Sequence, residues 1–381
     1  MKPYYQTSSF TVYVGDCREV LPSISLRADS CVTDPPYGLW FMGKDWDRSV
    51  PGQQFWEIIS NACTPGALCL AFGGTRTFHR LAVAIEDAGW EIRDTICWMH
   101  GQGFPKSMDV GKKVDVFKGY GTGLKPAYEP IVLAMKPTDG TFVDNALKHG
   151  VAGMNVDGCR IKHDEVCRQM NAQQTYNTEF RTNRSSDTEL KPIGRFPANL
   201  IHDGSEEVLE CFPMAKTGDI KPHEHKPSMF TGRHKHTPWK GSNGSASRFF
   251  YCAKASKAER NAGCEGLPEK PGLDLNTCSL IHRVDPDTGT VKISEYSPSK
   301  RRNHHPTVKP KALMEYLCKL TMTPTKGLVL DPFMGSGSTG IGCIMTGRPF
   351  VGIELSEEYA EIAVKRLLHW ESKEQDVLFP L

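Results

Sequence analysis

Short apolar runs alternate along the chain with segments whose apolar residues recur every three or four positions. The runs predict strands at residues 11–16, 30–33, 67–72, 91–98, 130–135, 327–330 and 350–354. The recurring pattern predicts helices around 55–59, at 78–89 and 311–320, before Gly347, and from 356 to about 370. Strands that alternate with helices indicate an α/β fold with a largely parallel sheet.

This alternation is lost between about residues 140 and 302, where proline, glycine, serine, asparagine and histidine are frequent. Within this region, residues 216–260 contain ten lysines or arginines and only three acidic residues. Five aromatic residues are interleaved with them: Phe230, Trp239, Phe249, Phe250 and Tyr251. The pattern is typical of surfaces that bind single-stranded or distorted nucleic acid. A solvated, partly disordered insert is the alternative, and this stretch alone favours it.

The apolar run 30–33 ends at Asp34-Pro35-Pro36-Tyr37, which places these residues at the carboxyl end of a strand. Open α/β sheets bind their ligands at that edge. The two prolines supply no backbone donors, so carbonyl oxygens are left beside one carboxylate and one aromatic ring. Such a corner can accept hydrogen bonds from the amine of a flat base and stack on its ring. A rigid turn that closes the strand is the alternative.

A second strand end, at Asp331, is followed by a glycine-rich loop that contains Phe333, Gly335, Gly337 and Thr339. A helix and a further strand, which ends at Glu354, complete a mononucleotide-binding βαβ unit. Glycines allow close approach of the backbone to a ligand, and the acid can accept hydrogen bonds from ribose hydroxyls. No Lys-Ser/Thr follows the glycines, which argues against a Walker loop. Nicotinamide cofactors and S-adenosylmethionine both remain open, and Glu354 could instead be a capping or surface acid.

The composition narrows the class of protein only modestly. The 381 residues carry a formal net charge of +2, so nucleic-acid affinity would have to come from a local patch. None of the 13 cysteines forms a C-x-x-C pair, which predicts reduced thiols and disfavours zinc at the histidine pairs His223/His225 and His234/His236. No signal peptide or membrane-spanning run is evident, so a cytoplasmic protein without a membrane partner is expected.

Three motifs together resemble the amino-methylating DNA methyltransferases that modify adenine N6 or cytosine N4. They are residues 34–37, 331–339 and 305–310 (His-Pro-Thr-Val-Lys-Pro). The catalytic motif precedes the cofactor motif, which is similar to the circularly permuted β group. The resemblance implies a seven-stranded Rossmann-like fold, with a catalytic half at 1–140, a target-recognition insert at 141–302 and a cofactor-binding half at 303–381.

The resemblance also implies roles for individual residues. Asp34 and the carbonyl of Pro35 would accept the hydrogens of the target amine, Tyr37 would stack on the flipped base, and Pro36 belongs to the same catalytic motif. S-adenosylmethionine would be bound by Asp16 on the adenine side, Thr307 and Lys309 at the methionine part, Glu354 at the ribose, and Asp331, Phe333, Gly335, Gly337 and Thr339 around the loop. Asp16 could instead cap a turn, and Lys309 could be solvated.

The implied function is site-specific methylation of double-stranded DNA, as in restriction-modification. Asp at the head of the 34–37 motif favours adenine N6, because the cytosine-N4 members often carry Ser there. Cytosine N4, a non-catalytic DNA-binding protein on the same scaffold and a nicotinamide-dependent oxidoreductase remain alternatives. RNA as the acceptor and a homodimeric assembly are left open.

Overall fold

The computed structural model describes residues 1–40, 45–101, 103, 107–161, 194–216, 243–253, 258–271, 281–284, 291–294 and 300–378. The chain divides into two units. Unit 1 comprises Met1–Ile96, Glu129–Met154 and Ala253–Leu381, and unit 2 comprises Cys97–Tyr128 and Asn155–Cys252. The two sequence motifs at 34–37 and 331–339 therefore belong to the same unit.

Unit 1 is built on a sheet with the strand order β1-β2-β16-β15-β3-β4-β6-β5. The five central strands from β2 to β4 are mutually parallel, whereas β1 and β6 run antiparallel to their neighbours β2 and β4. The strands are β1 (Tyr5–Gln6), β2 (Phe10–Val14), β3 (Ala28–Thr33), β4 (Cys63–Phe72), β5 (Glu91–Met99), β6 (Tyr128–Met135), β15 (Val329–Asp331) and β16 (Phe350–Glu354). All seven predicted strands are present, and the predicted α/β fold is confirmed.

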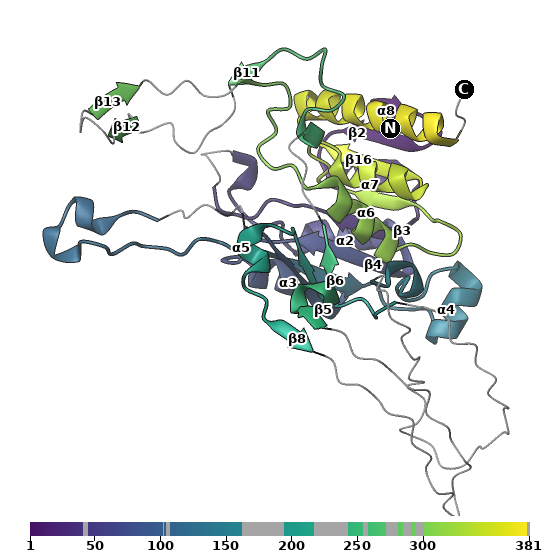
Figure 1. Cartoon of the computed structure of the whole chain (residues 1–381). Helices are drawn as coiled ribbons and strands as arrows, with labels where there is room; N and C mark the ends of the chain where they lie inside the picture. The colour runs from purple at the N-terminus through teal and green to yellow at the C-terminus, as the bar shows by residue number, and fades with distance from the viewer. Residues whose placement is uncertain are drawn as a thin grey trace, which may run out of the picture. The chain divides into compact units, whose positions relative to one another are not determined.

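Helices cover both faces of this sheet. On one side α1 (Cys17–Ser23), α2 (Gln53–Asn61) and α3 (Phe78–Asp87) pack over a core that includes Val351 and Ile353. On the other side α6 (Lys311–Leu320), α7 (Ser338–Thr346) and α8 (Glu357–Leu378) lie next to one another, as Figure 1 shows. Phe350 alternates with Val351 and faces Gly340 of α7. The result is a three-layer α/β/α unit.

Two helices of unit 1 were not predicted from the sequence. The first, α1, has only seven residues and contains Pro22, so its apolar pattern is short and interrupted. It begins because the Asp16 carboxylate accepts a hydrogen bond from the backbone N–H of Arg18 at 2.9 Å. The second, α4 (Phe142–His149), begins with a capping box formed by Thr141 and Asp144 and lies beside β4.

The remaining elements of unit 1 are short. They are η2 (Asp45–Asp47), η8 (Ala258–Arg260), the pair β11 (Lys270–Pro271) and β14 (Lys300–Arg301), and the hairpin β12 (Ile281–Val284) and β13 (Val291–Ser294). Within the described part of the chain, no helix is both long enough and apolar enough to cross a membrane.

The described residues of unit 2 form only short helices and strands. Its long loop folds back on itself through the bridge between Asp109 and Gly121 and carries η3 (Val110–Lys112) and η4 (Asp115–Phe117). The other elements are η5 (Asp157–Cys159), β7 (Leu200–His202), α5 (Glu206–Leu209), β8 (Met214–Lys216), β9 (Asn243–Ser245), η7 (Ala246–Phe249) and β10 (Tyr251–Cys252). In this unit β7 pairs in parallel with residues 97–99 and with β10.

Most of the predicted nucleic-acid-binding stretch at 216–260 lies outside the described residues. This applies to Lys221, Lys226, Arg233, Lys235, Lys240, Lys254, Lys257, Phe230 and Trp239, and to the four histidines His223, His225, His234 and His236. Among the described residues, the guanidinium groups of Arg195 and Arg248 lie 4.4 and 4.3 Å from the centre of the Phe249 ring. At least one aromatic ring of the stretch thus makes cation–π contacts within unit 2.

Candidate active site

The carboxyl ends of β3 and β15 bring the two predicted motifs together. These strands are parallel neighbours, so Thr33 and Asp331 end them at the same edge of the sheet. The Thr33 hydroxyl donates a hydrogen bond of 2.6 Å to Oδ1 of Asp331. Asp34-Pro35-Pro36-Tyr37 follow one of these strands and the glycine-rich loop follows the other. The two segments therefore begin next to each other, at strand ends that a hydrogen bond joins.

Asp331 connects the strand end to the glycine-rich loop. Its Oδ2 accepts a hydrogen bond of 2.6 Å from the Thr339 hydroxyl, and its Oδ1 accepts one of 3.1 Å from the backbone N–H of Phe333. Burial raises the pKa of the Asp331 carboxyl to about 7, although these three donors act in the opposite direction. Asp331 thus organises the loop from a buried position.

The glycine-rich loop has a backbone that only glycine adopts without strain. Gly335 and Gly337 have φ angles of 54° and 78°. A Cβ on Gly335 would lie 2.8 Å from Nε2 of His305, and a Cβ on Gly337 would lie 3.1 Å from Cβ of Ala363. From α8, the buried guanidinium of Arg366 donates hydrogen bonds to Ser336, at the carbonyl oxygen and at 3.0 Å to the hydroxyl. Both the backbone and the packing fix the shape of the loop.

Glu354, at the end of β16, holds the glycine-rich loop by its carboxylate. Its Oε2 accepts a hydrogen bond of 2.7 Å from the N–H of Gly335, and its Oε1 accepts one of 2.9 Å from the N–H of Ser356. Burial raises the pKa of this carboxyl. The end of β2 lies alongside, because the N–H of Gly15 donates to the carbonyl of Glu354 at 2.9 Å. Next to Gly15, the Asp16 carboxylate caps α1 and pairs with Arg18 at 2.6 Å.

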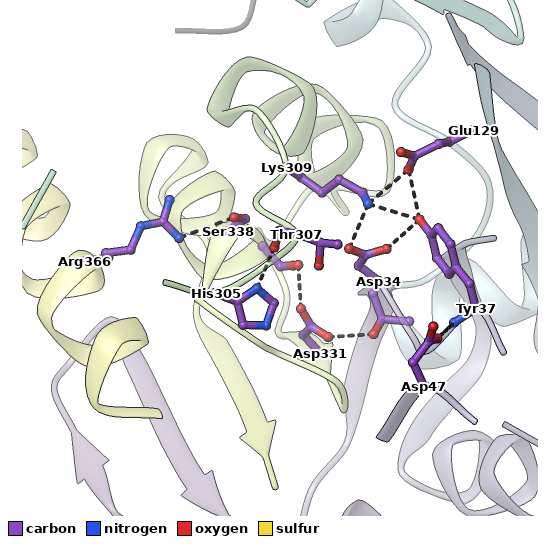
Figure 2. A network of polar contacts seen from close by, with 12 residues as sticks. Asp34, Tyr37, Asp47, Glu129, His305, Thr307, Lys309, Asp331, Ser338 and Arg366 are labelled. Carbon is purple, nitrogen blue, oxygen red and sulfur yellow. Dashed lines mark hydrogen bonds and ion pairs between the residues drawn. The ribbon is translucent and has the colours of Figure 1, made fainter. Parts of the chain in front are cut away.

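Four side chains form a charged cluster at the other strand end (Figure 2). The ammonium of Lys309 lies 2.8 Å from Oδ2 of Asp34, 3.0 Å from Oε2 of Glu129 and 3.0 Å from the Tyr37 hydroxyl. The Tyr37 hydroxyl lies 2.8 Å from Oδ1 of Asp34 and 2.9 Å from Oε2 of Glu129. Lys309 also lies 4.8 Å from the centre of the Phe72 ring, within the range of a cation–π contact.

The opposite charges in this cluster stabilise one another in their ionised forms. Burial lowers the pKa of an ammonium group, yet the charges of Asp34 and Glu129 outweigh that effect and raise the pKa of Lys309. Burial raises the pKa of Asp34, while Lys309 opposes the rise. Burial and the two neighbouring carboxylates raise the pKa of Tyr37 well above its usual value. Lys309 is therefore a stable cation at neutral pH, and the Tyr37 hydroxyl keeps its proton.

A further acidic residue fixes the loop after Tyr37. The Asp47 carboxylate accepts hydrogen bonds from the backbone N–H groups of Tyr37 at 2.7 Å and Gly38 at 2.9 Å.

In the 305–310 motif, Nδ1 of His305 lies 2.6 Å from the carbonyl oxygen of Thr307. Burial lowers the pKa of His305 to about 4, so its ring is neutral at physiological pH. The roles expected for Thr307 and Lys309 at the methionine part of a cofactor stay predictions. In the structure, the Lys309 ammonium forms ion pairs with the carboxylates of Asp34 and Glu129.

Sequence reasoning missed Glu129, Asp47 and Arg366. Glu129 comes just before the apolar run 130–135, at the start of β6. Because β6 runs antiparallel to β4, with Ile131 opposite Phe72, its first residues lie at the edge where the parallel strands end. An acid before a strand carries no such meaning unless the direction of that strand is known. Among the described residues, no group of histidine, cysteine and acidic side chains is arranged to hold a metal ion.

Comparisons with known proteins give partial sequence matches to methyltransferases. The chain is 46% identical over 129 residues to the type II methyltransferase M2.LlaDCHI of Lactococcus lactis subsp. cremoris, which is 34% of this chain and 40% of that protein. It is 35% identical over 129 residues, with the same shares, to M2.DpnII of Streptococcus pneumoniae. It is 44% identical over 64 residues to the DNA adenine methyltransferase YhdJ of Escherichia coli (strain K12), which is 17% of this chain and 21% of that protein. The matched stretches thus span 40% or less of these relatives.

Solved structures align over most of the chain at low identity. The cytosine-N4-specific PvuII DNA methyltransferase is 15% identical with a TM-score of 0.47, over 99% of this chain and 93% of that one. The complex of M1.HpyAVI with SAM is 17% identical with a TM-score of 0.42, over 94% and 98%. A family model described as DNA methylase matches residues 28–365 and so includes both strand-end motifs. The chain therefore belongs to the N6/N4 DNA methylase family.

Proposed function

We propose that this chain transfers the methyl group of S-adenosylmethionine to the exocyclic amine of a base in double-stranded DNA, with adenine N6 as the favoured acceptor. One observation carries the proposal. The Asp34 carboxylate and the glycine-rich loop start from strand ends that the Thr33–Asp331 hydrogen bond of 2.6 Å joins directly. A base at Asp34 and a cofactor at the loop would therefore meet at one edge of the sheet.

The residues around the glycine-rich loop fit S-adenosylmethionine. Gly335 and Gly337 leave the backbone open, and a Cβ at Gly335 would fill the space next to His305. Each Glu354 oxygen accepts one backbone hydrogen bond, so the carboxylate retains lone pairs for ribose hydroxyls. When bound, S-adenosylmethionine supplies an activated methyl group. A nicotinamide cofactor would use the same βαβ unit, and the cofactor that raises the melting temperature would distinguish the two.

The Asp34 corner fits an amine acceptor. Oδ1 and Oδ2 of Asp34 each have one partner in the cluster, Tyr37 and Lys309, so each oxygen can accept one more hydrogen bond. Hydrogen bonds from the amine to Asp34 and to the Pro35 carbonyl would localise the lone pair on nitrogen and direct it at the methyl group. Positioning and electrostatics would supply most of the rate enhancement.

The base has to leave the duplex to reach this corner, because its amine is otherwise paired. Tyr37 would stack on the extruded base and offset part of the stacking that is lost. Phosphate contacts from the 216–260 stretch would supply affinity, and a few side chains would read base edges. Asp34 at the head of the motif favours adenine, and the DNA adenine methyltransferase YhdJ among the relatives supports that choice. Cytosine N4 is the second candidate.

The variant Asp34→Ala tests the proposal. We expect it to abolish methyl transfer to DNA while S-adenosylmethionine, measured by calorimetry, binds within about twofold of the wild type. Asp87→Ala, an exposed acid at the end of α3, serves as the matched control and should leave both measurements unchanged. Full methyl transfer by Asp34→Ala would refute the assignment.

A further inference from the structure

The Tyr37 hydroxyl has more acceptors than it has protons. Oδ1 of Asp34 and Oε2 of Glu129 lie 2.8 and 2.9 Å from the Tyr37 oxygen, both at hydrogen-bond distance. A hydroxyl has one proton and two lone pairs, so it can donate to only one of these carboxylates at a time. Since the two distances are nearly equal, rotation about the C–O bond would turn the proton from one carboxylate to the other.

Lys309 occupies one of the two hydrogen-bond acceptor positions of the Tyr37 oxygen. Its ammonium, 3.0 Å away, donates to one lone pair. The second lone pair is free to accept a proton from Asp34 whenever the hydroxyl donates to Glu129. The ammonium also pairs with both carboxylates, at 2.8 and 3.0 Å, which allows two anionic groups to lie close to one phenol.

The reaction proposed above generates a proton at this position. The amine nitrogen uses its lone pair to form the new N–C bond, while the electron pair of the broken S–C bond stays on sulfur. The nitrogen becomes cationic and has to lose one of its hydrogens to an adjacent base. Asp34 is the carboxylate at that position, and a protonated Asp34 would have to be reset before the next turnover.

We propose that Glu129 is the final acceptor of this proton, which reaches it from Asp34 through the Tyr37 hydroxyl; the inference rests on the function proposed above. The amine proton moves to Oδ1 of Asp34. The Asp34 proton moves to the Tyr37 oxygen, while the proton of Tyr37 moves to Oε2 of Glu129. Asp34 and Tyr37 each give one proton and receive one, so the only net change is a protonated Glu129.

The surroundings favour proton transfer from Asp34 towards Glu129. The side chain of Glu129 is 26% exposed, so it can pass the proton on to water. Lys309, whose side chain is 7% exposed, cannot act as the acceptor because the charges of the two carboxylates raise its pKa and keep it protonated. Glu129 touches no substrate in this scheme and acts only through the Tyr37 hydroxyl.

Multiple-turnover methylation measured as a function of pH tests the relay, because Asp34 has to lose its proton between turnovers. With saturating DNA and cofactor, Glu129→Gln should lower kcat by about a hundredfold, at the lower end of the range of general acid–base effects. Tyr37→Phe keeps the ring for stacking and should produce a similar loss. The double variant should lose little more than either single variant, because both changes interrupt one pathway.

The pH profile separates a proton-transfer role from a merely structural one. The wild-type rate should fall towards acidic pH, because both Asp34 and Glu129 have to be ionised to accept the proton. In Glu129→Gln only Asp34 has to be ionised, so the rate should be low and should fall less steeply over the same range. S-adenosylmethionine binding by calorimetry should remain within about twofold in every variant, and Glu86→Gln, an exposed acid of α3, should behave as the wild type.

Three results would overturn the relay: wild-type rates in both single variants, fully additive losses in the double variant, or an unchanged acidic limb in Glu129→Gln. A wild-type protein that methylates no DNA would refute the proposed function itself. The two failures are therefore distinguishable.

Discussion

The Lys309 ammonium lies 2.8 Å from Oδ2 of Asp34, and this ion pair joins the 34–37 motif to the 305–310 motif. Asp34 follows β3, whereas Lys309 precedes α6. The pair is mostly shielded from solvent, with side-chain exposures of 7% for Lys309 and 20% for Asp34. A charge removed from this position would leave its partner uncompensated in a medium that screens poorly.

Replacement of the cation should therefore destabilise the fold. Lys309→Met leaves the carboxylates of Asp34 and Glu129 without a counter-ion, and we expect the free energy of unfolding to fall by about 3 kcal/mol. Urea denaturation at pH 7 measures the loss. Addition of Glu129→Gln should restore part of the stability, because one of the two uncompensated charges is then removed. Unchanged stability of Lys309→Met would show that the cluster is solvated.

The glycine-rich loop gives a prediction with a matched control. Gly335→Ala introduces a Cβ that meets the His305 ring at 2.8 Å, on a backbone with a φ of 54°. Gly150→Ala has a similar backbone, with a φ of 69°, but its Cβ meets nothing within 4 Å. Both variants should lose about 1 kcal/mol of stability from the backbone alone. Only Gly335→Ala should also lose S-adenosylmethionine binding, by tenfold or more in calorimetry. Equal binding by both variants would remove the loop from the cofactor site.

Asp331 predicts a pH dependence of stability. Its folded-state pKa of about 7 lies above the unfolded value of 3.8, so the folded state binds the proton more tightly. The stabilisation is complete below about pH 4 and is lost as the pH rises through about 7. Asp331→Asn should flatten this part of the curve of melting temperature against pH, whereas Asp87→Asn should not. Parallel curves for the wild type and Asp331→Asn would contradict the raised pKa.

These sites show what the sequence could and could not predict. Asp34, Asp331 and Glu354 each follow an apolar run, so their position at one sheet edge follows from the rule that parallel strands end together. Glu129 reaches the same edge only because β6 is antiparallel, and strand direction depends on the topology of the whole sheet. Asp47 lies in an irregular segment before α2, where no periodicity marks it. The helix α1 was missed because Pro22 interrupts its pattern.

DNA affinity should depend on the basic stretch at 216–260. Replacement of Lys221, Lys226, Arg233, Lys235 and Lys240 by Gln should weaken binding and lower the slope of log K against log salt by up to about 0.9 per lost phosphate contact. Replacement of the four lysines by Arg keeps the charge and should preserve the slope. Fluorescence anisotropy over a range of salt concentrations measures both. An unchanged slope in the Gln variant would place the phosphate contacts elsewhere.

Analysis of the modified nucleosides tests the central claim most directly. Double-stranded DNA is incubated with the protein and S-adenosylmethionine that carries an isotopically labelled methyl group, then digested to nucleosides and analysed by mass spectrometry. We predict label in N6-methyldeoxyadenosine for the wild type and none for Asp34→Ala. Label in N4-methyldeoxycytidine would support methyl transfer to an exocyclic amine but would identify cytosine, not adenine, as the acceptor base. The absence of labelled nucleosides, or label at C5 of cytosine, would contradict the account.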